Sequence, residues 1–150
     1  MTITKHVTDI LNSTIDSVKN VIPFDLSIDK PYLFKQPYTQ HSIGVLIGMT
    51  GDVRGRLIID GDETIFGSIG EGMFGMKVEG EMLQSFAGEL GNMIAGTLST
   101  VISKHKMEMD ITPPTVLVGE TKIFGFEKAF CLPVTMNHVG NLNILLMIEQ

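Results

Sequence analysis

The hydrophobic positions near the N-terminus recur every three or four residues. Val7, Ile10, Leu11 and Ile15 open this pattern, which continues through Val18 to Ile22, and polar residues fill most of the positions between them. This periodicity predicts an amphipathic helix with one face buried. Pro23 follows the pattern, and a proline cannot continue a helix without losing a backbone hydrogen bond. The helix is therefore expected to end there.

Two further helical segments are expected in the middle of the chain. Residues 62–64 (Asp-Glu-Thr) suit the start of a short helix, and the glycines of "GSIGEGMFG" suit its end. A longer helix is predicted from about Glu79 to Lys104. Acidic residues lie near its start and basic residues near its end, and both placements stabilise the helix dipole.

The remaining segments carry the patterns of strands. Residues 24–34 partly alternate, and two β-rich runs flank the turn Thr50-Gly51-Asp52, which predicts a hairpin. The C-terminal third reads as three more strands: "MDITPPTVLVG", "FGFEKAFCLPVTM" and "NLNILLMIEQ". The two consecutive prolines of the first require an edge position or a break in pairing. The order of elements predicts a single α+β domain over residues 1–150, with a mostly antiparallel six-stranded sheet and three helices packed on it.

Composition narrows the classes of partner and compartment. The net charge of −6 argues against nucleic acid or an anionic membrane as the main partner. The single cysteine, Cys131, lies in an apolar run and is expected to be a buried thiol, which suits a reducing compartment. The chain has no apolar run of about 18 residues, and its N-terminal segment lacks the apolar stretch of a signal peptide. A cytoplasmic protein is expected.

The long predicted helix carries a polar stripe on one face. Ser85, Glu89, Asn92 and Gly96 are spaced by four, three and four residues, which places them on one side of a helix. Small residues lie on or beside this stripe: Gly88, Gly91, Ala95 and Ser99. Each glycine costs about 1 kcal/mol relative to alanine in a helix interior. We interpret the glycines as clearance that lets another surface approach Glu89 and Asn92, although the pattern alone also fits a packing stripe.

Metal and cofactor chemistry receive no support from the motifs. No histidine or cysteine lies at ligand spacing on the long helix. The four histidines are scattered and are expected to be surface or hydrogen-bonded residues: His6, His41, His105 and His138. No Walker loop, nucleophile elbow or dinucleotide fingerprint is present. We therefore expect no metal site and no cofactor of the chain's own.

The stripe in its context resembles a known family. Ser85-x3-Glu89-x2-Asn92-x3-Gly96 within "AGELGNMIAG" resembles the active-site helix of the CheC/CheX/FliY chemotaxis phosphatases. The strand "MDITPPTVLVG", the hairpin "GMTGDVRGRLIID" and the amphipathic first helix fit the same family, so the resemblance spans nearly the whole chain. The first helix offers Asp9-x-x-Asn12 but no Glu three residues before an Asn. A single motif favours the CheX branch of the family over the CheC branch.

The resemblance implies a function and roles for the stripe. The substrate would be a phosphorylated CheY-type response regulator, which supplies its own Mg²⁺. Asn92 would orient the attacking water, and Glu89 would pair with the active-site lysine of the regulator. Ser85, Gly88 and Gly96 would contact the partner, and the protein would form a homodimer.

Two other functions stay open from the sequence. One is a non-catalytic module that binds a response regulator or a flagellar switch component. The other is a structural oligomer in which the glycines pack helix on helix.

Overall fold

Three helices form where the sequence predicts them. The computed structural model describes residues 5–35, 37–40, 42–126 and 128–149. The helices are α1 (Lys5–Val21), α2 (Glu63–Phe74) and α3 (Gly80–Ser103). Helix α2 ends at Gly75, whose φ of 73° is the left-handed conformation common at helix ends. Among the described residues, no helix is long and apolar enough to cross a membrane.

An antiparallel sheet forms the second layer of the domain. Its strands follow the order β1-β9-β10-β5-β4-β6, with β2 also on β9 and β7 also on β4, and every pairing is antiparallel. The α+β class predicted from the sequence is confirmed. The strands of this sheet are β1 (Leu26–Ile28), β2 (Tyr32–Lys35), β4 (Ile43–Gly51), β5 (Gly55–Gly61), β6 (Met109–Ile111), β7 (Thr115–Val118), β9 (Lys128–Met136) and β10 (Gly140–Ile148).

The predicted count of six strands is wrong, because the described part of the sheet contains eight. Two of the predicted strands, at residues 24–34 and in "MDITPPTVLVG", are each split into two short strands that pair with the same neighbour. Pro31 precedes β2 on one edge, and Pro113 and Pro114 lie between β6 and β7 on the other. A proline has no N–H to donate to a ladder, so pairing is interrupted there. The sheet is therefore six positions wide, and each of its two edges consists of two short strands.

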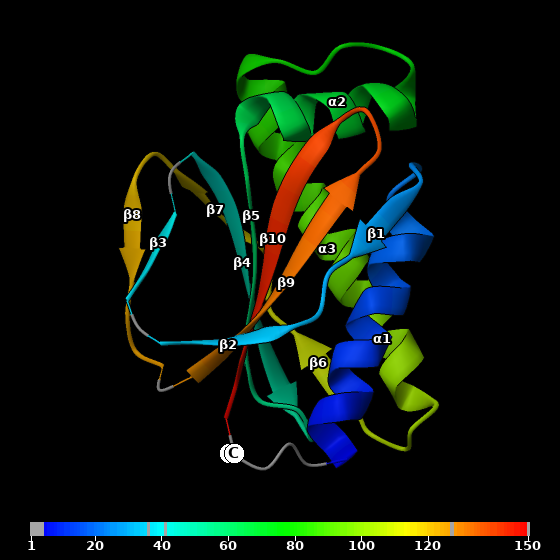
Figure 1. Cartoon of the computed structure of the whole chain (residues 1–150), viewed down its shortest axis with the longest axis vertical. Coiled ribbons are helices and arrows are strands. Elements are labelled where there is room, and N and C mark those ends of the chain that lie inside the picture. Colours follow the sequence, from blue (N-terminus) through cyan, green and yellow to red (C-terminus); the bar gives the residue numbers. More distant parts are fainter. Residues whose placement is uncertain (1–4, 36, 41, 127, 150) are drawn as a thin grey trace.

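A small second sheet was not predicted. Strands β3 (Tyr38–Gln40) and β8 (Thr121–Ile123) pair antiparallel with each other. At three residues each, these strands are too short to show a period-2 pattern. In Figure 1 they form an arm at the left of the main sheet. The arm packs on the sheet face opposite the helices, where Tyr38 and Ile123 share a small core with Ile58.

The main core lies between the sheet and helices α1 and α3, which lie beside each other in Figure 1. Leu57 and Ile59 of β5 are buried on this side, and Ile58 between them is buried on the other. That alternation is the pleat of a strand covered on both faces. Ser17 of α1 is buried, and its Oγ donates a hydrogen bond to the carbonyl oxygen of Ile94 in α3 at 2.6 Å. The middle of α3 is thereby held on one side by α1 and on the other by the sheet.

Candidate functional site

The polar stripe predicted on the long helix lies at the surface of α3. Ser85 and Glu89 are exposed, and Asn92 and Gly96 are half-buried. All four belong to the uninterrupted helix α3, so their predicted common face is confirmed. Glu89 and Asn92, three residues apart, are neighbours on this surface, with about 5–6 Å expected between their Cβ atoms.

Neither Glu89 nor Asn92 is engaged by another residue of the described part of the chain. Their side chains form no hydrogen bond or ion pair with another residue that the structure describes. Carboxylate and amide groups usually find partners or water. These two side chains are therefore available to a group that approaches from outside.

The opposite side of α3 is buried in the core and makes the helix a rigid platform. Leu90, Ile94 and Leu98 have no exposed surface. Helix α3 contacts α1, the strand β4 and the edge strands β6 and β7 that pair with β4. A side chain on such a helix is placed more accurately than one on a loop. The backbone positions of Glu89 and Asn92 are therefore set by packing on the far side of the same helix.

The glycines of the stripe have two different roles. A Cβ added to Gly91 would lie 2.6 Å from Cγ1 of Val45, and one added to Gly88 would lie 3.3 Å from Cγ2 of Val116. A Cβ added to Gly96 would meet nothing within 4 Å. The interpretation of the glycines as clearance for a partner therefore stays a prediction for Gly96, which has open space beside it. It is wrong for Gly88 and Gly91, which are buried and let α3 approach its own sheet.

The two consecutive prolines form one border of this region. Pro114 lies beside Gly88, with its Cγ 3.9 Å from the position of an added Cβ. Thr112 holds the interruption in place: its N–H donates to the carbonyl of Gly48 at 2.9 Å, and its Oγ1 accepts from the N–H of Gly48 at 2.8 Å. The break between β6 and β7 is thus a fixed feature next to the helix that carries Glu89 and Asn92.

The other candidate groups lie away from the stripe or are unreactive. Cys131 is buried, as predicted, and burial raises the pKa of its thiol. His6 and His138 are exposed, as is His105, whose Nδ1 lies 3.6 Å from Oδ2 of Asp9. His41 lies outside the described residues. No group of three or more His, Cys, Asp or Glu side chains in the described ranges could hold a metal ion.

A groove beside the stripe was missed by the sequence reasoning. It has a volume of about 840 Å³ and lies at the junction between the end of α2 and the start of α3. Three of its apolar side chains are 58% exposed: Phe74, Met76 and Met82. The signal in the sequence was an apolar group at a junction of two helices, where polar residues are usual. Ser85 and Glu89 of the stripe line the same groove.

The fold defines the class of protein: this chain is one of the CheC-like α+β proteins. A CheC-like superfamily protein from Shewanella sp. PV-4 has the same fold, with a TM-score of 0.80 and 26% identity over 99% of this chain and 100% of that chain. A structure of the CheX–CheY–BeF₃–Mg²⁺ complex from Borrelia burgdorferi matches with a TM-score of 0.79. There the identity is 22% over 97% of this chain and 99% of that chain.

Sequence comparison gives the family. The family model of the chemotaxis phosphatase CheX matches residues 43–133. The CheY-P phosphatase CheX of Thermotoga maritima is 32% identical over 148 residues, which cover 96% of each chain. The chain therefore belongs to the chemotaxis phosphatase CheX family, which confirms the family and the hydrolase class expected from the sequence.

Proposed function

We propose that this protein hydrolyses the aspartyl phosphate of a phosphorylated CheY-type response regulator. The name of the Thermotoga maritima relative, CheY-P phosphatase, supports this substrate. The observation that carries the proposal is the pair of Glu89 and Asn92. Both are unpaired with other described residues, and both stand on the accessible side of a helix whose far side is buried.

Asn92 is the residue proposed to act on the water. An acyl phosphate is already reactive, so a phosphatase gains most from placing water in line with the phosphorus–oxygen bond. The amide of Asn92 can accept a hydrogen bond from that water through its oxygen and donate one through its NH₂ group. Its half-buried position on a rigid helix would limit the directions in which the amide can point.

Glu89 is proposed to anchor the complex. Its exposed carboxylate lies one helical turn before Asn92 and can pair with the active-site lysine of the regulator. Hydrogen bonds between an ammonium and a carboxylate are about twice as strong as neutral ones. Ser85 and Gly96 extend the contact along the same face. The open space above Gly96 leaves room for the partner to lie close to the helix backbone.

The metal of the reaction is proposed to come with the regulator. Phosphoryl transfer uses Mg²⁺ to neutralise charge on the phosphoryl oxygens. The Borrelia burgdorferi complex combines CheX and CheY with Mg²⁺ and BeF₃, a group that resembles a phosphoryl group in shape and charge. On this proposal the present chain contributes side chains and shape, and no metal ligand.

We also expect a homodimer with one site in each protomer, acting in the cytoplasm. The dimer is checked by light scattering on the purified protein. A mass of one chain across the working concentrations would contradict that expectation without touching the proposed chemistry.

The lifetime of phosphate on the regulator tests the function. Asn92→Ala should leave binding of the phosphorylated regulator largely intact and remove hydrolysis, whereas Glu89→Ala should weaken both. Asn12→Ala is the matched control, because Asn12 is an exposed helical asparagine on α1. Normal turnover by the Asn92→Ala protein would contradict the proposal that Asn92 orients the attacking water.

The alternative is a non-catalytic module that docks on a response regulator or a flagellar switch component. The same assay separates the two functions. If the protein binds the regulator and leaves the phosphate lifetime unchanged, the binding module is the correct description. A panel of CheY-type regulators should be used, because the substrate is one particular regulator.

A further inference from the structure

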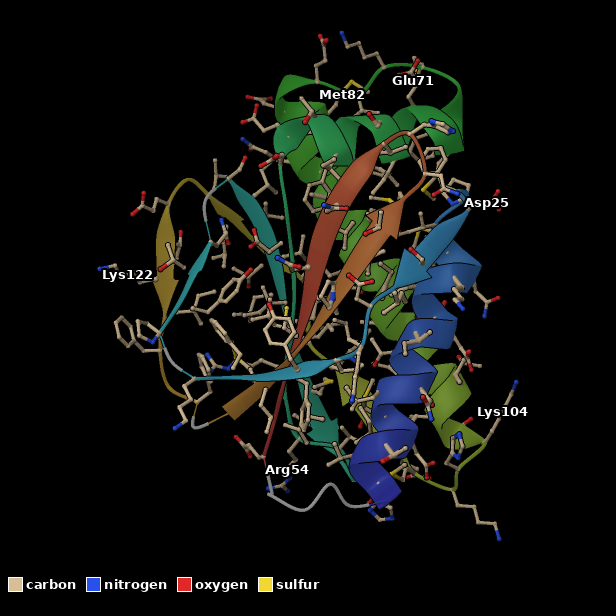
Figure 2. All side chains as sticks on the ribbon, in the orientation of Figure 1. Asp25, Arg54, Glu71, Met82, Lys104 and Lys122 are labelled. Carbon is tan, nitrogen blue, oxygen red and sulfur yellow. The ribbon has the colours of Figure 1, made fainter. Side chains whose placement is uncertain are left out.

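The groove between α2 and α3 is formed by apolar side chains that the chain itself leaves uncovered. Two of the lining side chains, Val78 and Phe86, are buried. Three others are exposed: Phe74, Met76 and Met82. Figure 2 shows Met82 at the end of the molecule where α3 begins, with Glu71 of α2 nearby. Single exposed apolar residues are common on protein surfaces, but a contiguous group rimmed by polar residues indicates an interaction site.

The shape of the groove is built into the fold. Phe74 packs edge-to-face on Phe86, with ring centroids 5.6 Å apart and an interplanar angle of 82°. The loop that carries Met76 lies between two glycines with positive φ, 73° at Gly75 and 62° at Gly80. Residues other than glycine rarely adopt such angles, so these two glycines let the chain turn between α2 and α3 without backbone strain.

The groove continues into the proposed active site. Ser85 and Glu89 belong both to the polar stripe and to the groove lining. A regulator that reaches Glu89 and Asn92 must lie over the stripe, and part of its surface would then cover the groove. The apolar side chains are therefore placed to contact the same partner as the catalytic pair.

The charge around the groove indicates the chemistry of that partner. Glu81 and Glu89 are exposed carboxylates that line it, and Glu71 is a further exposed carboxylate near the end of α2. The nearby cation, Lys77, is already paired with Glu79 at 3.2 Å. An apolar hollow with an acidic rim favours a partner that offers an apolar side chain flanked by lysine or arginine.

We propose that this groove receives an apolar side chain, flanked by basic residues, that the phosphorylated regulator presents beside its phosphorylation pocket. The inference rests on the proposed function and makes the groove a determinant of which regulator is bound. Methionine side chains suit the role because they adapt to the shape of the group they receive. The groove sets the affinity for the regulator, and Asn92 sets the rate of hydrolysis.

The test uses a double variant, Met76→Gln with Met82→Gln, which removes apolar surface while nearly preserving side-chain length. We expect affinity for the regulator activated with beryllofluoride and Mg²⁺ to fall on the order of tenfold, which corresponds to about 1.4 kcal/mol. In the hydrolysis assay, KM should rise by a similar factor and kcat should stay the same. Leu33→Gln is the control, because Leu33 is 43% exposed on the edge strand β2, away from the groove.

A charge test adds a second measurement. Glu81→Lys should weaken binding at low salt and lose most of that effect at high salt, because exposed charges are screened. An effect of Glu81→Lys that is the same at low and high salt would overturn the assignment of the rim.

The outcomes distinguish this inference from the proposed function. If the wild-type protein leaves the phosphate lifetime unchanged, the proposed function fails, and the binding measurement still tests the groove. Unchanged affinity of the double methionine variant overturns the groove proposal even if hydrolysis is normal. A variant that loses self-association and keeps its affinity for the regulator also overturns it, because the occupant is then a second copy.

Discussion

Two glycines of helix α3 should respond in opposite directions to the same substitution. Gly91→Ala and Gly96→Ala each remove the conformational penalty of a glycine inside a helix, and each gains about 1 kcal/mol of helix propensity. At Gly96 the new methyl group meets nothing within 4 Å. At Gly91 it would lie 2.6 Å from Cγ1 and 3.2 Å from Cβ of Val45.

The packing cost at Gly91 decides the sign. Val45 of β4 is β-branched and has no exposed surface, so its side chain cannot rotate away without moving other core residues. Overpacking of this kind costs about 1–3 kcal/mol. A cost near the middle of that range, about 2 kcal/mol, less the gain of about 1 kcal/mol in propensity, means that Gly91→Ala should lower the free energy of unfolding by about 1 kcal/mol. Gly96→Ala should raise it by about 1 kcal/mol.

Urea unfolding followed by circular dichroism measures both changes by linear extrapolation. For a protein of this size, 1 kcal/mol corresponds to about 2–4 °C in Tm, so thermal scans should separate the two variants clearly. Gly96→Ala should also weaken regulator binding, because its methyl group occupies the space above the helix. Equal stabilisation by both substitutions would refute the argument that Gly91 exists for packing on Val45.

Two further predictions concern the face of the sheet opposite the helices. Tyr38 donates a hydrogen bond to Asp60, and burial together with that carboxylate raises the pKa of its hydroxyl. The unfolded chain then loses this proton first, so stability is present below about pH 10 and is lost as the pH rises above that value. Urea midpoints at about pH 9 and about pH 11 should show a smaller loss for Tyr38→Phe than for wild type, and equal losses would contradict the reasoning. Cys131 should react with an aromatic disulfide reagent only in denaturant, because its thiol is buried and its pKa is raised, and rapid labelling of the native protein would contradict this.

Much of the architecture could be predicted because it depends on local pattern. The three- and four-residue spacing of Val7 to Ile22 gave α1, and the glycine and acidic residues at 62–75 gave the ends of α2. The turn after Gly51 gave the hairpin of β4 and β5. Such signals lie within a few residues of the element that they predict. The three-residue strands β3 and β8 carry no such signal and were missed.

The sequence by itself also determined the composition of the site. A spacing of three residues on a helix places Glu89 and Asn92 on one face whatever surrounds them. That geometry is local, and it is the same in the structure. The roles of the two residues remain predictions that rest on their chemistry and on the family.

Only the tertiary structure decided which residues near the stripe face outward and which face the core. Gly88, Gly91 and Gly96 look alike in the sequence, yet two of them lie against Val116 and Val45 and one lies under open space. The groove of Phe74, Met76 and Met82 likewise forms only when α2 and α3 meet. The physical reason is that burial depends on contacts between elements far apart in the chain, and the periodicity of one helix contains no information about what packs against it.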